Sequence, residues 1–246
     1  ARFALMDLPD CVPEADLAKA EDLADRWILH RLQELKAEVK QATLDYRFND
    51  AAQGLYRFIW GEFCDWYLEM IKPRMQSGDE ARKAVTQRCL FTVLSETMLL
   101  LHPIMPFVTQ EIWTHLPGLA GTDIAVQPFP EAVEALKDPE AARRMELFQG
   151  VVAAVRNIRS ELLIDPARRL SLLVRTVSEE DRAVIDENAG LIVFLARLEK
   201  VETGPEVKGP RASGTAVVNG NELFVPLEGI VDFDAELARL DQELAK

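Results

Sequence analysis

Aromatic and arginine side chains gather in one short segment of this 246-residue sequence. Eight of the eighteen aromatic residues lie between Tyr46 and Tyr67, where they are interleaved with Arg47 and Arg57. Nucleobases stack on aromatic rings or guanidinium planes, and arginine also contacts phosphates. The segment therefore has the side chains that bind unpaired nucleotides. A helix core with an ordinary solvated face is the competing interpretation.

The motifs of common enzyme active sites are missing from the sequence. There is no GxxxxGK[ST], GxGxxG, GxSxG or HExxH. The three histidines, His30, His102 and His115, lie on different predicted helices or helix ends, so an independent enzyme would need distant residues to converge. The three cysteines form no CxxC pair and have no histidine at ligand spacing. We therefore expect no catalytic residue, no metal and no cofactor in this chain.

Charge is distributed unevenly along the chain, whose formal net charge is −13. Residues 26–88 carry eleven basic and nine acidic side chains, and residues 143–175 carry seven arginines against three acids. Residues 1–25, in contrast, carry two basic and seven acidic side chains. Because distant exposed charges are screened, a basic segment of an acidic protein can still attract a polyanion. Solvated helix faces explain the same pattern, so this alternative stays open.

The aromatic segment belongs to one of four predicted amphipathic helices. Apolar side chains at spacings of three and four predict helices at residues 16–40, about 49–72, about 80–101 and 106–116. Asn49 or Asp50 is expected to cap the second helix, and Pro73 to end it. Ser77 or Asp79 could cap the third. The short connections predict an antiparallel bundle.

Helical spacing divides the aromatic side chains of the second helix between core and surface. The predicted core stripe consists of Tyr56, Ile59, Phe63, Trp66, Tyr67 and Met70. Phe58 and Trp60 flank this stripe, and Arg57 lies on the polar face. Arg47 and Phe48 precede the cap, where side chains tend to be accessible. The stripe explains most of the rings but not all of them.

A second, smaller domain is predicted after a polar stretch at residues 118–139. Its expected elements are helices at 140–163 and 178–198, strands at 170–176 and 198–203, and a hairpin at 215–228 that turns at Asn219-Gly220. Leucines at spacings of three and four from residue 232 onward indicate the start of a truncated coiled-coil helix. The predicted fold is mainly α: an antiparallel helical bundle (1–139), a smaller α+β domain (140–231) and the start of a C-terminal helix (232–246).

Two stretches resemble a known family. ADRWILHRLQELKAEVKQATLDYRFNDAAQGLYRFIWGEFCDWYLEMIKPRM (24–75) and LLHPIMPFVTQEIWTHLP (100–117) are similar to the anticodon-binding domain of class I aminoacyl-tRNA synthetases of the valine, isoleucine and leucine group. Residues 46–69 most resemble the bacterial valyl-tRNA synthetases, as do the C-terminal segments 151–176 and 218–246. The HIGH and KMSKS motifs of the class I active site, and an editing domain, are absent. The resemblance implies a C-terminal fragment that is inactive alone, because ATP binds in the parent's catalytic domain.

The resemblance also implies what the fragment binds. Its bundle is expected to hold the anticodon loop of valine tRNA, whose second and third anticodon bases are A and C. The implied RNA-binding residues are Phe48 as a stacking platform, Arg31 and Arg47 for phosphates or base edges, Asn49 as a base reader, Arg57 and Trp60 in reserve, and Arg156 and Arg159 for the tRNA body or the catalytic domain.

Several alternatives remain open at this stage. The chain could be the same domain of an isoleucyl- or leucyl-tRNA synthetase, although FCDWYLE and the absence of a C-terminal cysteine cluster favour valine. It could also be a helical protein-interaction module without an RNA function. No apolar run reaches the roughly 20 residues that span a bilayer. We expect a monomeric, cytoplasmic protein whose partners are valine tRNA and the parent catalytic domain, with no membrane contact.

Overall fold

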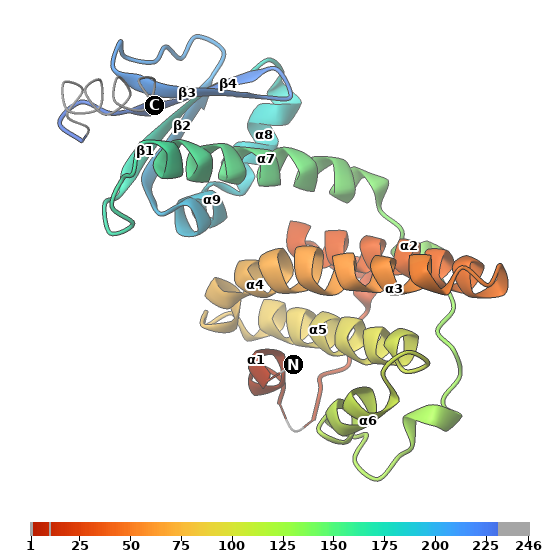
Figure 1. Ribbon diagram of the computed structural model, residues 1–246. Helices are drawn as coiled ribbons and strands as arrows, with labels where there is room; N and C mark the ends of the chain where they lie inside the picture. The colour runs from red at the N-terminus through yellow and green to blue at the C-terminus, as the bar shows by residue number, and fades with distance from the viewer. Residues whose placement is uncertain (1, 10, 231–246) are drawn as a thin grey trace. The chain divides into compact units, whose positions relative to one another are not determined.

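The computed structural model describes residues 2–9 and 11–230, which form two compact units (Figure 1). The first unit runs to Ala142 and is helical, and the second begins at Arg143 and combines helices with a sheet. The predicted fold class, mainly α with a smaller α+β part, is confirmed. The coiled-coil helix predicted for residues 232–246 lies outside the described residues.

The helices of the first unit follow the predicted order. They are α1 (Arg2–Met6), α2 (Leu23–Leu44), α3 (Phe48–Arg57), α4 (Leu68–Met75), α5 (Glu80–Leu101) and α6 (Pro106–Thr114), with 3-10 turns at Leu17–Lys19, Ile124–Val126 and Glu134–Leu136. Short connections make the successive long helices reverse direction and pack side by side (Figure 1). Asp79 caps α5 as predicted, because its carboxylate accepts a hydrogen bond from the Arg82 backbone N–H at 3.1 Å.

A ten-residue π-helical segment, η2 (Phe58–Tyr67), joins α3 to α4. The helix is therefore continuous from Phe48 to Met75. The prediction that Pro73 ends this helix was wrong, since Pro73 lies inside α4 and the helix continues to Met75. Proline removes one backbone donor, and here the helix ends within the same turn.

The π-helical segment changes which aromatic side chains face the core. Phe58 is buried, whereas Tyr56 is 66% exposed, which is the reverse of the predicted arrangement. Backbone hydrogen bonds in a π-helix run from i to i+5, so the buried stripe steps back five positions from Phe63 to Phe58. Regular α-helical spacing before Phe58 then leaves Tyr56 exposed on α3. Phe63, Tyr67 and Met70 are buried as predicted.

A buried ionic network fixes α2 to the continuous helix and to α5. Asp25 is fully buried and accepts hydrogen bonds from the hydroxyl groups of Tyr67 and Thr86 at 2.8 and 2.9 Å. Arg74 donates to the same carboxylate at 2.8 Å. Burial raises the pKa of Asp25, and the positive charge of Arg74 opposes this shift. The network holds these helices in one register, because each carboxylate oxygen has a partner.

Helix α5 contains a long apolar stretch. By length and composition alone it could cross a membrane, but more than half of this stretch is buried inside the protein. Leu90, Val93 and Leu94 belong to the core, and α5 packs against α2, α3, α4 and α6. The apolar character of α5 is therefore that of a central helix in a bundle.

Up to residue 230, the second unit contains a four-stranded sheet and three helices. Its elements are α7 (Pro139–Glu161, which begins in the first unit), β1 (Leu170–Arg175), α8 (Glu179–Glu187), α9 (Ala189–Ala196), β2 (Leu198–Gly204), β3 (Ser213–Val218) and β4 (Asn221–Pro226). The strand order is β2-β1-β4-β3, with β1 and β2 parallel and the other pairs antiparallel. The helix predicted at 178–198 is divided at Asn188, whose side-chain amide donates to the Val184 carbonyl at 2.8 Å.

Glycine is required at two places around the sheet, one in the turn between β3 and β4 and one on the helix that packs against β3. Asn219 and Gly220 have φ angles of 49° and 84°, so the predicted two-residue hairpin turn between β3 and β4 is confirmed. A Cβ on Gly150 of α7 would lie 2.5 Å from a methyl carbon of Val218 on β3. Glycine at this position lets α7 approach the sheet closely.

Candidate nucleic-acid interface

The turn between α2 and α3 exposes two aromatic rings. Tyr46 is 81% exposed and Phe48 59% exposed, and their ring centroids lie 6.1 Å apart with the planes at 89°. Tyr46 has a φ of 58°, in the left-handed region that bulky residues rarely adopt. An edge-to-face pair leaves ring faces available, so this turn can present a stacking surface to solvent.

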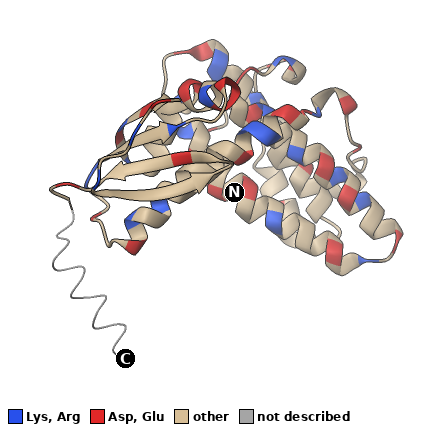
Figure 2. Cartoon of the chain, turned by 90° about the horizontal axis from the view of Figure 1, so that it is seen from above, with Lys and Arg blue, Asp and Glu red and all other residues tan. Residues whose placement is uncertain are grey.

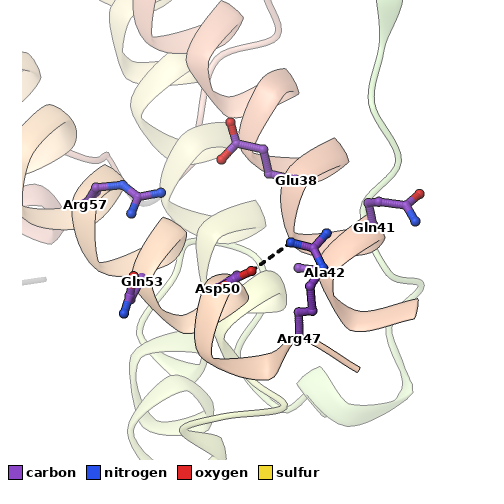
Figure 3. A pocket seen from close by; sticks show the side chains of 7 residues that line it. All are labelled: Glu38, Gln41, Ala42, Arg47, Asp50, Gln53 and Arg57. Carbon is purple, nitrogen blue, oxygen red and sulfur yellow. Dashed lines mark hydrogen bonds and ion pairs between the residues drawn. The ribbon is translucent and has the colours of Figure 1, made fainter. Parts of the chain in front are cut away.

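A polar pocket of about 470 Å³ lies between the end of α2 and the beginning of α3 (Figure 3). It is lined by Glu38, Gln41, Ala42, Arg47, Asp50, Gln53 and Arg57. The volume is in the range of small-molecule sites. Amide, guanidinium and carboxylate groups together provide both donors and acceptors, which the edge of a nucleobase requires.

Arg47 connects the aromatic turn to the polar pocket. Its guanidinium pairs with Asp50 at 2.7 Å (Figure 3). It also pairs with Asp45 at 3.1 Å. The hydrogen bonds with Asp45 and Asp50 raise the pKa of Arg47. All three side chains are exposed, and exposed ion pairs contribute little free energy. Arg47 can therefore exchange a carboxylate for a phosphate at small cost.

The start of α3 differs from the prediction. The helix begins at Phe48, and the Arg47 carbonyl accepts hydrogen bonds from the backbone N–H groups of Asp50 and Ala51 at 3.0 and 3.2 Å. Neither Asn49 nor Asp50 is the cap, because both lie within the first turn and Asp50 is engaged by Arg47. Asn49 is exposed in that turn.

Arg57 reaches the polar pocket from α3. Figure 3 shows its guanidinium extending toward the Glu38 carboxylate on α2. Within residues 2–9 and 11–230, Arg57 has neither an ion pair nor a side-chain hydrogen bond. A guanidinium without a fixed partner can bind a phosphate in two-pronged geometry.

Trp60 and Arg31 lie outside the polar pocket. Trp60 is 55% exposed on η2, has its ring 6.5 Å from that of Tyr56, and borders an apolar groove of about 370 Å³ formed with α5 and α6. Arg31 on α2 donates two hydrogen bonds to Glu62 at 2.8 and 2.9 Å and also pairs with Glu34. The hydrogen bond with Glu62 raises the pKa of Arg31. Arg31 therefore joins α2 to η2, and a phosphate would have to compete with Glu62.

Arg156 and Arg159 belong to the second unit. Arg156 donates to the Leu195 carbonyl at 3.1 and 3.3 Å. Arg159 is only 8% exposed and donates to the carbonyl oxygens of Asp165, Pro166 and Arg168. Both arginines therefore also hold main-chain segments in place.

Four residues to which the interface gives a part were not among the predicted RNA-binding residues. Glu38 and Gln41 line the pocket from α2, Gln53 lines it from α3, and Tyr46 contacts Phe48. Glu38 and Gln41 could have been predicted, because they lie three positions apart on the solvated face of α2, about one turn from its end. Tyr46 could not have been predicted in this way, because no sequence pattern indicates its left-handed backbone conformation.

The histidines take part in local structure. His102 Nδ1 lies 2.7 Å from the Thr109 hydroxyl, and His115 Nδ1 lies 2.8 Å from the Glu111 carbonyl oxygen. His30 is buried and accepts a hydrogen bond from the Asp138 backbone N–H at 3.0 Å. Throughout the part of the chain that the structure describes, no three His, Cys, Asp or Glu side chains gather into a metal-binding group.

Known proteins resemble this chain along its whole length. The family model described as the anticodon-binding domain of tRNA ligase matches residues 25–174, which include the aromatic turn and the polar pocket. The valine–tRNA ligase of Nitratidesulfovibrio vulgaris is 54% identical over 100% of this chain and 28% of its own length. That of Geobacter sulfurreducens is 41% identical with the same coverage, and that of Bacillus licheniformis is 42% identical over 98% of this chain and 27% of its own. The chain thus spans slightly more than a quarter of these relatives.

Proposed function

Because this chain belongs to the family of anticodon-binding domains of tRNA ligases, we propose that its helical unit binds the anticodon loop of a transfer RNA. The observation that carries the proposal is the pair of exposed rings, Tyr46 and Phe48, next to a polar pocket that contains Arg47 and Arg57. Stacking and phosphate contacts are the two interactions that single-stranded RNA uses most.

The transfer RNA is proposed to be that of valine. Three relatives that match 98–100% of the chain are named valine–tRNA ligase, at 54%, 42% and 41% identity. The parent protein is accordingly proposed to be an ATP-dependent valine–tRNA ligase that is cytoplasmic and monomeric and makes no membrane contact. Its catalytic domain lies outside this chain, which would select tRNA without aminoacylating it. The bundle at 1–139 is proposed as the anticodon-binding domain and 140–231 as an accessory α+β domain.

Each side chain of the interface has a proposed role. A base of the loop stacks on Phe48, while Arg47 and Arg57 hold the phosphates on either side of it. Asn49 reads a base edge from the first turn of α3, together with the polar side chains Gln41 and Gln53 of the pocket. Trp60 and Arg31 would contribute only if the loop extends along η2.

Selection of the correct loop would come from differences in binding free energy. A base whose edge does not match leaves polar groups unpaired, at about 1–3 kcal/mol for each group that becomes buried. The pocket residues Gln41 and Gln53 are exposed before binding, so the value for each should lie near the lower end of that range. Two mismatched positions would then separate cognate from non-cognate loops by roughly 30-fold.

A titration with short RNA hairpins tests this function directly. The chain would be titrated with anticodon stem-loops of valine, isoleucine and leucine tRNA at fixed salt concentration. Tighter binding of the valine loop is the expected result. Preference for another loop would assign the chain to the corresponding synthetase. Equal binding of all three would overturn the proposed selectivity, and absent binding would favour a helical protein-interaction module.

A further inference from the structure

Eight of the ten arginines at residues 143–230 fall into two groups according to their partners; Figure 2 colours arginine and lysine blue. The first group, each of whose members pairs with a carboxylate, is Arg143, Arg144, Arg175 and Arg182. The second group, whose members donate to main-chain carbonyl oxygens and form no ion pair within residues 143–230, is Arg159, Arg168, Arg169 and Arg197. A carbonyl oxygen carries no net charge. The positive charges of the second group are therefore not neutralised by their partners.

Three of these arginines line two adjoining cavities where α7, α9 and the loop at 162–169 meet. One cavity, of about 360 Å³, is lined by Arg156, Arg159, Ser160, Ile164, Pro166, Leu195, Ala196 and Arg197. The other, of about 330 Å³, is lined by Pro166, Ala167, Arg169, Phe194 and Arg197. The two cavities share Pro166 and Arg197. Their walls contain four arginines, which we call the arginine cluster (Arg156, Arg159, Arg169 and Arg197), and no acidic side chain.

Arg159 has an unsatisfied donor at this place. Its Nη2 donates to three carbonyl oxygens, but its Nη1 is buried and has no acceptor among the described residues. A buried donor without an acceptor destabilises the folded protein. An anion with several oxygen atoms that reached this guanidinium would supply the missing hydrogen-bond acceptor for Nη1.

Two like charges are also held close together. The Pro166 carbonyl oxygen accepts hydrogen bonds from both Arg159, at 3.4 Å, and Arg197, at 3.2 Å. Burial lowers the pKa of Arg159, and the charge of Arg197 lowers it further, although nearby Asp165 opposes the shift. Arg197 has a φ of 54°, a left-handed conformation that glycine or asparagine would adopt with less strain. Two unfavourable features thus coincide at Arg197: its charge repels that of Arg159, and its backbone is in a left-handed conformation.

The helix ends nearby do not supply enough negative charge to balance the cluster. The C-terminal ends of α7 and α9 each contribute about half of a negative charge, and Asp165 contributes one more. The three guanidinium groups that form no ion pair within residues 143–230, those of Arg159, Arg169 and Arg197, already exceed this total. The cluster keeps a net positive charge in a concave site, where electrostatic attraction of anions is strongest.

We propose that the arginine cluster binds a backbone phosphate of the transfer RNA outside the anticodon loop. The source of the phosphate rests on the proposed function, whereas the site itself rests on the geometry of the second unit. Arginine suits such a site because its planar fork matches the oxygens of a phosphate.

Full-length tRNA and the isolated hairpin separate this site from the anticodon site. Arg197→Gln removes one charge and one hydrogen bond to the Pro166 carbonyl, and Arg175→Gln is the matched control on an arginine that already has a carboxylate partner. Arg197→Gln should weaken binding of full-length valine tRNA roughly three- to tenfold and reduce the salt slope by about one. Hairpin binding should not change, Arg197→Lys should restore part of the affinity, and Arg175→Gln should behave as wild type. Wild-type binding of full-length tRNA by Arg197→Gln, or an equal loss for Arg175→Gln, overturns the proposal.

Inorganic phosphate tests the site without RNA. In an NMR titration of the full chain, phosphate should shift the Arg159 Nε–Hε signal to a plateau, whereas chloride at equal ionic strength should not. The shift should disappear in Arg197→Gln. An Arg159 signal that phosphate does not move overturns the site. Failure of the hairpin titration alone overturns only the anticodon function, so the two failures are distinguishable.

Discussion

Replacing Phe48 with alanine removes the proposed stacking platform and little else. A base stacked on an aromatic side chain contributes roughly 1–3 kcal/mol, which corresponds to about 5- to 150-fold in affinity. Tyr46 lies 6.1 Å away and remains as a second ring, so we expect the lower part of this range, roughly 5- to 20-fold. Because Phe48 is 59% exposed, the free energy of unfolding should change by less than about 1 kcal/mol.

Fluorescence anisotropy with a labelled valine anticodon hairpin measures this loss, and urea unfolding measures stability. Phe107→Ala is the matched control, because Phe107 is 91% exposed on α6 and has no role in the proposed site. The double variant Arg47→Ala, Phe48→Ala should lose at least about tenfold while its melting temperature stays nearly constant. Binding by Phe48→Ala that equals the binding by Phe107→Ala would refute the stacking argument, whatever the affinity of the wild-type chain.

Three further predictions concern charge, the buried network and the hairpin. Arg57→Gln should weaken hairpin binding and reduce its salt slope by about one, with unchanged stability; an unaltered slope in a salt series would exclude a phosphate contact. Asp25→Ala should lower the free energy of unfolding by about 3 kcal/mol, because it leaves Arg74 without its buried partner. Urea unfolding measures this loss, and Asp22→Ala, which removes a more exposed partner of Arg74, is the control that should lose less. Gly220→Ala should cost about 1–2 kcal/mol through its φ of 84° and leave hairpin binding intact, and a variant as stable as wild type would contradict the turn argument.

The fold was largely predictable because its elements carry local signals. Helix α5 begins after Asp79, which was named as a cap, and the β3–β4 turn falls at Asn219-Gly220. The exchange of Tyr56 and Phe58 between surface and core was not predictable. It depends on the π-helical hydrogen bonds of η2, which arise from packing and leave no periodic pattern of their own.

The candidate site was only partly predictable for a related reason. Arg47, Phe48 and Arg57 were predicted because their side chains suit RNA and helical spacing places them outside the core stripe, and the structure leaves all three exposed. Arg31 was predicted only through the family resemblance, and its partner Glu62 comes from another helical segment, thirty-one positions away. Sequence pattern shows which residues can bind RNA. Which of them already have a partner depends on tertiary contacts.

The uninterrupted helix from Phe48 to Met75 carries the exposed ring at one end and Arg74 of the Asp25 network near the other. At about 1.5 Å per residue it is a rod of roughly 40 Å. Arg74 ties one end to the buried Asp25, and α3 packs against α2 and α5 at the other end, so the position of Phe48 depends on packing along the whole helix. Weakening the Asp25 network would therefore be expected to move the Phe48 ring relative to the polar pocket. The proposed selectivity among anticodon loops would then decrease even though every contact residue is unchanged.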